Sequence, residues 1–425
     1  MFKYIALIVF ALSTPLNACA APPKPAPTPR LKTPGAENKP APAPTVQDQA
    51  QIFAAWKRGF MARAIAKGYD AALVKATIGP AKINPKAIQS NEQQPEFTRA
   101  IWTYVDGVVS TSRLDGGRAK LAKHADLFGD IEARYGVDRT VLTSIWGLES
   151  AYGKILGHDN MIDSLATLAS QGRRQKFGEQ QLFGLLDMLA RGDVRRDQLV
   201  GSWAGAMGMT QFIPTTFRDY AVDYDNNGNK DLWTDVGDAL ASTAYYLSRF
   251  GWRGAEPIVT EVLLPEGFNY GLSDGTKRSI SGWSAMGVRP VGGKNWSKEA
   301  LFLEAKLLIP AGVNGPVFLT FKNFDVIKKY NNSTSYALGI TVLAEALQGK
   351  KTITKDWPRQ DKPLARSHKK ALQEALTNQG YSTGGIDGMI GPNSRRAIRA
   401  WQRANGLAAD GYVNQALLRR VLTGK

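Results

Sequence analysis

The stretch DRTVLTSIWGLESAYG, residues 138–153, combines a helical apolar pattern with one acidic side chain on its apolar face. Four apolar residues recur at helical spacing and define that face: Leu142, Ile145, Trp146 and Tyr152. Glu149 follows Ile145 by four residues, so it lies on the same face. Asp138 has a carboxylate suited to an N-cap, and Gly153 is suited to end the helix. The stretch therefore predicts a helix that directs Glu149 toward a core.

Glu149 has two open interpretations at this point. An ionised carboxylate directed at a core is costly unless it is paired or used. It is either a helix-end residue paired with an arginine, or a partly desolvated carboxyl with a raised pKa. A carboxyl of the second kind donates a proton near neutral pH, so Glu149 is a candidate general acid.

The composition predicts a large, basic, globular chain. Its 425 residues allow two or three domains, and its hydrophobic share of 43% allows a substantial core. The formal net charge is +17, and residues 350–425 hold 15 Lys/Arg against 5 Asp/Glu. Such a basic end suggests an anionic partner, which is nucleic acid, an acidic lipid or an anionic wall polymer.

Residues 1–20 are typical of an export signal. Lys3 precedes the apolar run Tyr4–Leu12, which is too short to span a bilayer. The only cysteine, Cys19, lies in a Leu-Asn-Ala-Cys sequence that resembles a bacterial lipobox, with Asn17 as an imperfect fit. The alternative is an ordinary cleavage site that discards Cys19. We favour a lipidated Cys19 that anchors the protein to the outer membrane, and in both cases the mature chain is exported without a disulfide. Export argues against nucleic acid as the partner.

The composition divides the remaining chain into four parts. Residues 21–47, rich in Pro and Ala, form a tether, and residues 48–348 form a large body. Residues 349–365 form a second linker, and residues 366–425 form a small terminal unit. The body is mainly helical, and short β-type runs between residues 257 and 325 predict an inserted α+β subdomain. Expected helices, besides 138–153, cover residues 46–68, 95–110, 162–170, 179–190, 235–250 and 333–347.

A second informative stretch is GSWAGAMGMTQFIP, residues 201–214. Its small residues let the backbone approach another backbone or a ligand closely. Gln211 offers donors and acceptors that suit an amide or a sugar hydroxyl. Tight packing between helices is the alternative interpretation of the small residues.

Several motifs together resemble the membrane-bound lytic transglycosylase B family. They are GLESAYG around Glu149, DSLATLAS at 163–170, the 201–214 stretch, and YNNS at 330–333 with Tyr336-Ala337. Their order and spacing agree over roughly 300 residues. The resemblance implies a lysozyme-like helical domain with a smaller α+β subdomain. It also implies cleavage of peptidoglycan between N-acetylmuramic acid and N-acetylglucosamine.

The resemblance implies a reaction with one catalytic carboxyl. Glu149 would protonate the glycosidic oxygen and then deprotonate the C6 hydroxyl of the same muramic acid, which closes a 1,6-anhydro ring. No catalytic cofactor is needed. Ser202 would orient Glu149, and the substrate-binding residues would be Ser202, Gln211, Tyr246, Tyr330, Asn331 and Tyr336. Two alternatives stay open, which are a hydrolytic muramidase that uses water and a non-catalytic wall-binding scaffold.

A separate motif, DYDNNGN at residues 223–229, matches the start of an EF-hand calcium loop. The expected ligands of a structural calcium or sodium ion are Asp223, Asp225, Asn227, Asn229 and Asp238. Thr234 stands where a glutamate normally closes the loop, so Asp238, or less favourably Asp235, would close a longer one. A metal-free turn rich in Asp and Asn is the alternative.

The terminal unit resembles the small helical peptidoglycan-binding domain of wall hydrolases. Asp387-Gly388 and Asp410-Gly411 are two matching turn signals around a helix that contains Arg399–Arg403. Ile398, Trp401 and Leu407 are the expected core. We therefore expect a monomeric periplasmic enzyme whose partner is the glycan strand.

Overall fold

The computed structural model describes residues 46–92, 100–293 and 295–424. The predicted signal peptide, Cys19 and nearly all of the 21–47 tether lie outside these residues, so what the sequence predicts for them stays a prediction. Within the described ranges, no helix is both long and apolar enough to cross a membrane.

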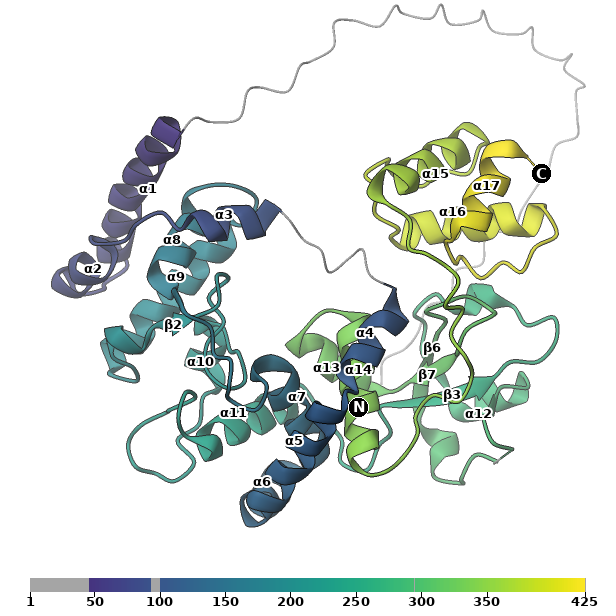
Figure 1. The fold of residues 1–425 in the computed structure, drawn as a ribbon, viewed down its shortest axis with the longest axis horizontal. Helices are drawn as coiled ribbons and strands as arrows, with labels where there is room; N and C mark the ends of the chain where they lie inside the picture. Colours follow the sequence, from purple (N-terminus) through teal and green to yellow (C-terminus); the bar gives the residue numbers. More distant parts are fainter. Residues whose placement is uncertain (1–45, 93–99, 294, 425) are drawn as a thin grey trace, which may run out of the picture. The chain divides into compact units, whose positions relative to one another are not determined.

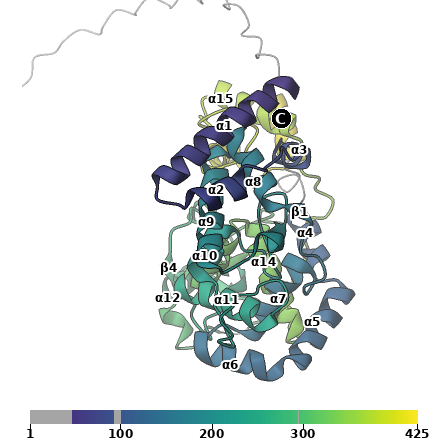
Figure 2. The same cartoon turned by 90° about the vertical axis from the view of Figure 1, so that its left-hand side faces the viewer.

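Helices form most of the body between Val46 and Leu347 (Figures 1 and 2). In chain order they are α1 (Val46–Ala66), α2 (Ala71–Ile78), α3 (Pro85–Glu92), α4 (Ile101–Val108), α5 (Thr111–Lys123), α6 (Ala125–Tyr135), α7 (Arg139–Ser150), α8 (Met161–Ser170), α9 (Gln175–Arg191), α10 (Pro214–Tyr220), α11 (Val236–Arg249), α13 (Lys322–Tyr330) and α14 (Thr334–Leu347). The expected helices are present within the described residues. α9 begins four residues earlier than Glu179. The expected 95–110 helix corresponds to α4 from Ile101 to Val108, and its first part, residues 95–99, lies outside the described residues.

α7 is the central helix of this body. It packs against α5, α6, α11 and α14, and nearly all of its residues from Thr140 to Gly147 are buried. A helix that is buried almost all round sits in the interior of a fold. Leu142, Ile145 and Trp146 belong to the largest apolar core of the chain. The position of α7 therefore fixes the position of Glu149.

Two details of the predicted ends of this helix need correction. Asp138 is the N-cap residue, as predicted, but its carboxylate makes no cap hydrogen bond, and Glu132 Oε1 from α6 accepts the Arg139 N–H at 2.6 Å. The helix ends at Ser150, before Gly153. The next residues turn into the left-handed region, with φ of 49° at Ala151 and 62° at Tyr152.

The predicted α+β subdomain is a five-stranded antiparallel sheet with a helix, α12 (Ile280–Ala285). The strand order is β4-β6-β7-β3-β5, for β3 (Val259–Leu263), β4 (Arg278–Ser279), β5 (Arg289–Pro290), β6 (Glu304–Leu308) and β7 (Phe318–Thr320). Leu307 opposes Leu319 in the register of β6 and β7. Trp283 of α12 is fully buried, and its indole N–H donates to Ala305 O at 3.0 Å, which ties the helix to the sheet. Another short antiparallel pair, β1 (Asp159–Asn160) with β2 (Val200–Gly201), leads into the 201–214 stretch.

The predicted second linker, residues 349–365, has no helix or strand, yet specific contacts hold it against the body. The buried carboxylate of Glu261 accepts from Thr354 N at 2.7 Å, from Thr354 Oγ1 at 2.6 Å and from Lys355 N at 3.0 Å. Trp357 is buried, and its ring lies 6.1 Å from that of Trp102. Residues 349–365 therefore form a strapped connection, by which we mean a linker that is held to the body at Thr354, Lys355 and Trp357.

The terminal unit has three helices, α15 (Arg366–Asn378), α16 (Pro392–Ala404) and α17 (Gln415–Thr423). Its core contains Ile398 and Trp401, with Leu407 packed against it, as expected. The Trp401 indole N–H donates to Gln379 Oε1 at 2.8 Å, which satisfies its only polar group.

Candidate active site

Glu149 lies half-buried in the last turn of α7, and its Oε1 accepts a hydrogen bond of 2.6 Å from the hydroxyl of Tyr336. Tyr336 comes from the first turn of α14, where Ser333 Oγ caps the helix by accepting the Tyr336 N–H at 3.2 Å. The direct packing of α14 on α7 brings the two side chains together. A neutral phenol is thus a partner of the carboxylate.

Two tyrosine hydroxyls in this region remain protonated at any working pH. Burial, and after it the negative charge of Glu149, raises the pKa of Tyr336 well above its ordinary value. The same two causes raise the pKa of Tyr330. Each phenol is therefore a permanent hydrogen-bond donor beside the glutamate.

The chain leaves Glu149 through a tightly held turn. Ser150 Oγ donates to Met209 O at 2.6 Å and accepts the Gly153 N–H at 2.9 Å. The first bond connects α7 to the 201–214 stretch, and the second closes the turn after α7. The left-handed conformations of Ala151 and Tyr152 each cost free energy in a non-glycine residue, so the surrounding contacts must impose them.

Tyr152 fills a slot formed by three glycines. A Cβ at Gly116, Gly117 or Gly147 would lie 2.7–2.8 Å from an atom of the Tyr152 side chain. At Gly117 it would also lie 2.7 Å from the side chain of Leu347. The Tyr152 hydroxyl donates to Arg113 O at 2.6 Å. The ring thus fastens the end of α7 to α5.

The 201–214 stretch is a compact loop, and its small residues allow close packing; the role of Gln211 toward a ligand stays a prediction. Ser202 Oγ accepts the Ala206 N–H at 3.0 Å. A Cβ at Gly208 would lie 2.6 Å from Leu232 O, so close packing requires that glycine. Gln211 has φ of 52°, and its Nε2 donates to Gly208 O at 2.9 Å and to Leu156 O at 3.3 Å. In this structure Gln211 binds its own loop.

An aromatic cluster joins this loop to Glu149. The rings of Tyr330 and Tyr336 are parallel, with centroids 6.5 Å apart, and Tyr246 meets Tyr330 edge-on at 5.4 Å. The Tyr246 hydroxyl donates to Lys329 O at 2.8 Å, and the Tyr330 hydroxyl donates to Thr210 O. These hydroxyls hold backbone carbonyls.

The structure thus brings together most of the residues that the resemblance selected. Tyr336 contacts Glu149 directly, and Tyr330 and Tyr246 follow in the ring cluster. Asn331 is exposed at the end of α13, next to Tyr330. Ser202 belongs to the loop that Ser150 and Tyr330 hold at Met209 and Thr210.

Sequence reasoning missed the supporting residues Ser150, Thr210 and Tyr152. Ser150 donates to the backbone carbonyl of Met209, and the backbone carbonyl of Thr210 accepts from Tyr330. A pattern of residue types does not reveal bonds to backbone carbonyls. Tyr152 was assigned only to the apolar face. The pair Gly116-Gly117 inside a helix was an available signal, because glycine is unfavourable there without a packing reason.

The predicted metal loop places three carboxylates within reach of one ion. One oxygen from each of Asp223, Asp225 and Asp238 lies within 4.8 Å of the others. Asp238 is fully buried and accepts from Tyr224 N and Asp231 N, both at 2.7 Å. Asp235 caps α11 by accepting the Asp238 N–H at 2.9 Å, so Asp238 is the better closing ligand. A cluster of three carboxylates in this loop fits a calcium ion, which prefers such oxygens.

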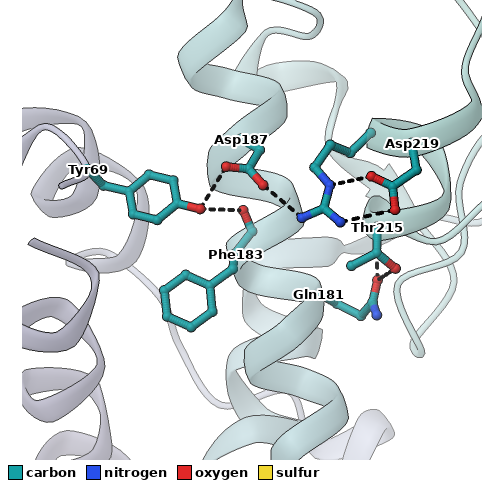
Figure 3. Close-up of polar contacts among 7 residues, drawn as sticks. Tyr69, Gln181, Phe183, Asp187, Thr215 and Asp219 are labelled. Atoms are coloured by element: carbon teal, nitrogen blue, oxygen red, sulfur yellow. Dashed lines mark hydrogen bonds and ion pairs between the residues drawn. The ribbon is translucent and has the colours of Figure 1, made fainter. Parts of the chain in front are cut away.

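Another polar network fixes α10, which follows the loop (Figure 3). Arg218 donates to Asp187 Oδ2 at 3.0 Å and to both oxygens of Asp219. Asp187 Oδ1 also accepts from the Tyr69 hydroxyl at 2.7 Å, and burial, with this carboxylate, raises the pKa of Tyr69 to about 12. Gln181 of α9 accepts from Thr215 N and Oγ1 at 3.1 and 3.0 Å. The network binds the segment between α1 and α2 to α9 and α10, and so supports the loop.

The fold and site define a transglycosylase of the lysozyme-like kind, and the comparisons agree. The family model of the transglycosylase SLT domain matches residues 52–345, and that of a peptidoglycan binding domain matches residues 369–421. The chain belongs to the transglycosylase SLT-domain family. It is therefore a lytic transglycosylase that acts on peptidoglycan.

Individual relatives are similar along most of their length. The chain is similar to SltB3 from Pseudomonas aeruginosa, solved in complex with NAG-anhNAM-pentapeptide, at 45% identity and a TM-score of 0.84, covering 87% of this chain and 99% of that one. It is 28% identical to the membrane-bound lytic murein transglycosylase B of Escherichia coli over 82% of this chain and 98% of the relative. The Escherichia coli lytic transglycosylase Slt35, solved in complex with calcium, has 27% identity, a TM-score of 0.58, and coverage of 69% and 92%.

Proposed function

We propose that Glu149 is the single acid and base of this lytic transglycosylase. The reaction cleaves the β-1,4 bond between N-acetylmuramic acid and N-acetylglucosamine and leaves 1,6-anhydromuramic ends. The observation that carries the assignment is the bond from Tyr336 to Glu149 in the buried end of α7. That bond fixes the orientation of the carboxyl group at the end of α7.

The proton follows a closed path. Glu149, protonated, gives its proton to the glycosidic oxygen as the C1–O bond breaks. The resulting carboxylate then takes the proton of the C6 hydroxyl, whose oxygen bonds to C1 of the same sugar. Glu149 ends as it began, protonated. Intramolecular capture gains from proximity, with effective molarities of roughly 10⁵–10⁸ M in well-oriented cases.

The sequence around the site favours this path over hydrolysis. Two-carboxylate glycosidases need a nucleophile or a base besides the acid. The stretches 147–153, 201–214 and 330–337 contain no Asp or Glu other than Glu149. A nucleophile from the substrate itself removes the need for another carboxylate.

The remaining candidate residues have positioning and binding roles in this proposal. Tyr336 holds Glu149, and Ser202 orients it from the neighbouring loop. The substrate contacts come from Gln211, Tyr246, Tyr330 and Asn331. Gln211 would exchange its bonds to Leu156 O and Gly208 O for an amide or hydroxyl of the glycan.

We assign the Asp223 loop to a structural calcium ion, or a sodium ion, with Asp223, Asp225, Asn227, Asn229 and Asp238 as ligand residues. The three convergent carboxylates support this assignment. The calcium complex of Slt35 supports it as a likeness. The ion takes no part in the proton path.

The cellular setting follows from the N-terminal sequence. The enzyme is exported to the periplasm and anchored to the outer membrane through lipidated Cys19, with the 21–47 tether as the spacer and a monomer as the working unit. A murein enzyme named as membrane-bound among the relatives supports this. Mass spectrometry of the intact protein from a membrane fraction, compared with Cys19→Ala, tests the lipid.

Digestion of peptidoglycan in heavy-oxygen water tests the chemistry. Mass analysis should find 1,6-anhydromuramic ends without the label, lighter by one water than hydrolysis products. Label at the new muramic terminus would mean that water is the nucleophile, and the muramidase alternative would replace this proposal. Absence of any cleavage by a folded protein would favour the scaffold alternative.

A further inference from the structure

The terminal unit contains the same hydrogen-bonded turn twice. In the first turn, Asp387 Oδ1 accepts from Gln373 Nε2 at 3.0 Å and from Met389 N at 2.8 Å, and Gln373 Oε1 accepts the Gly388 N–H at 2.7 Å. In the second turn, the corresponding three bonds involve Gln402, Asp410, Gly411 and Tyr412, at 2.8, 2.9 and 2.8 Å. Both glycines have positive φ, 77° at Gly388 and 71° at Gly411. The two turns are built alike.

The second turn is already occupied by a peptide segment of the same chain. The carboxylate oxygen that takes no part in the turn's own bonds, Asp410 Oδ2, accepts the backbone N–H of Val313 at 3.0 Å. The preceding residue, Gly312, has φ of 69°, and an L-type Cβ there would lie 2.7 Å from Asp410 Oδ2 and 2.9 Å from Tyr412 Cβ. The turn therefore accepts an N–H that follows a residue in the left-handed conformation. D-amino acids favour that conformation, because they mirror the preference of L-residues.

The first turn presents the same acceptor to solvent. Asp387 Oδ2 accepts no hydrogen bond from any residue that the structure describes, and the side chain is exposed. The Gln373 amide, together with the Met389 N–H, lowers the pKa of Asp387, so the acceptor is ionised at neutral pH. Beside it, Ile386 is 46% exposed and Met389 is 61% exposed, so two apolar side chains next to the acceptor are accessible to a ligand.

We propose that the exposed turn Ile386–Met389 binds the peptide of peptidoglycan at a D-alanine, with Asp387 Oδ2 accepting the N–H that follows this residue. The occupied turn is the template, with glycine at positive φ in place of the D-residue. The close approach that bars an L-type Cβ at Gly312 does not apply to the mirror-image Cβ of a D-residue, and the exposed Ile386 and Met389 supply apolar contact area beside the bound residue. The proposal rests on the peptidoglycan-directed function, and it assigns the module to the peptide part of the wall.

The experiment measures retention of the full chain on intact sacculi in the Glu149→Gln background, which prevents digestion. Asp387→Asn keeps an oxygen for Gln373 and Met389 but turns the exposed acceptor into a donor. Met389→Ser removes the apolar cover from the same turn without touching the carboxylate. Glu374→Gln, an exposed carboxylate of α15, is the matched control with the same change in charge. Circular dichroism confirms that each variant is folded.

Both turn variants should be retained about tenfold less well, equivalent to ~1.4 kcal/mol, whereas Glu374→Gln should match the parent. Soluble diacetyl-Lys-D-Ala-D-Ala should compete for the parent, and its epimer with L-alanine in the first alanine position should not. Equal retention of Asp387→Asn and Glu374→Gln would overturn the proposal. Equal competition by the two epimers would overturn it too, as would the same loss on glycan strands stripped of peptide. The activity of the chain with Glu149 on soluble fragments reports separately on the catalytic proposal.

Discussion

The hydroxyl of Tyr336 lies 2.6 Å from Oε1 of Glu149, although 187 residues of chain separate them. Tyr336→Phe keeps the ring and removes this bond. The glutamate then samples more orientations, so kcat should fall by roughly 10- to 100-fold while KM changes little. Steady-state turnover of soluble glycan fragments measures the split. Tyr245→Phe, a hydroxyl deletion on α11, is the control, and an equal loss there would point to general loosening.

Glu149→Gln preserves shape and removes the titratable proton. Turnover should fall by at least roughly 10²–10⁴-fold, as for loss of a general acid and base. Binding of glycan fragments should survive, because the side-chain volume is unchanged. Calorimetric titration with a product fragment checks the binding. Wall digestion at a near-parental rate would remove Glu149 from its role.

The Tyr152 phenol should make stability depend on alkaline pH. Burial raises its pKa to about 12 from the model-compound value of 10.0. A pKa raised in the folded state gives stability that is fully present below pH 10 and is lost as the pH rises toward 12, by up to about 3 kcal/mol for this group. In Tyr152→Phe, urea unfolding should show a shallower decline between pH 9.5 and 11 than in the parent. Parallel declines would mean that Tyr152 does not contribute.

The glycine slot should reject even one methyl group. Gly147→Ala places a Cβ 2.7 Å from Tyr152 ring and hydroxyl atoms, so it should destabilise the fold by roughly 1–3 kcal/mol. Gly129→Ala in α6 meets its nearest atom only at 3.9 Å. It should instead be neutral or stabilising by up to ~1 kcal/mol, because alanine favours helix. Chemical denaturation of both variants makes the comparison. A neutral Gly147→Ala would show that Tyr152 moves freely.

Calcium should raise the melting temperature. An ion that binds only the folded state stabilises it by roughly 2.7 kcal/mol when present at one hundred times its Kd. Asp223→Ala with Asp225→Ala should abolish the rise, and Asp115→Ala, an exposed carboxylate of α5, should retain it. Differential scanning calorimetry with and without chelator gives the result. No shift in the parent at millimolar calcium would leave the metal-free turn as the better description.

Periodicity and motif order predicted the central helix, the inserted sheet and the three-helix end, because burial patterns are local in sequence. The N-cap position of Asp138 was right, but its capping bond and the last residue of α7 were wrong for a physical reason. The Arg139 N–H bonds to Glu132 from another helix, and the chain makes a left-handed turn at Ala151 and Tyr152, where Tyr152 is packed in the glycine slot, before it reaches Gly153. Such tertiary contacts leave no local signal.

In the site, too, local sequence signals were predicted and tertiary contacts were not. Glu149 was found because a carboxylate on an apolar face is unusual, and the resemblance supplied Tyr330 and Tyr336. Neither indicated that the hydroxyls of Tyr330 and Tyr246 would donate to Thr210 O and Lys329 O, respectively, rather than point outward. Polar partners made by backbone carbonyls depend on the folded path of the chain.

The strapped connection between Glu261 and residues 354–355 changes what the terminal unit contributes. A binding module on a flexible linker raises the local concentration of substrate without fixing the orientation of the module. Here the buried carboxylate of Glu261 and the buried indole of Trp357 hold part of the connecting segment against the body. The length of chain that can move freely between the body and the terminal unit is therefore shorter than the 349–365 segment itself.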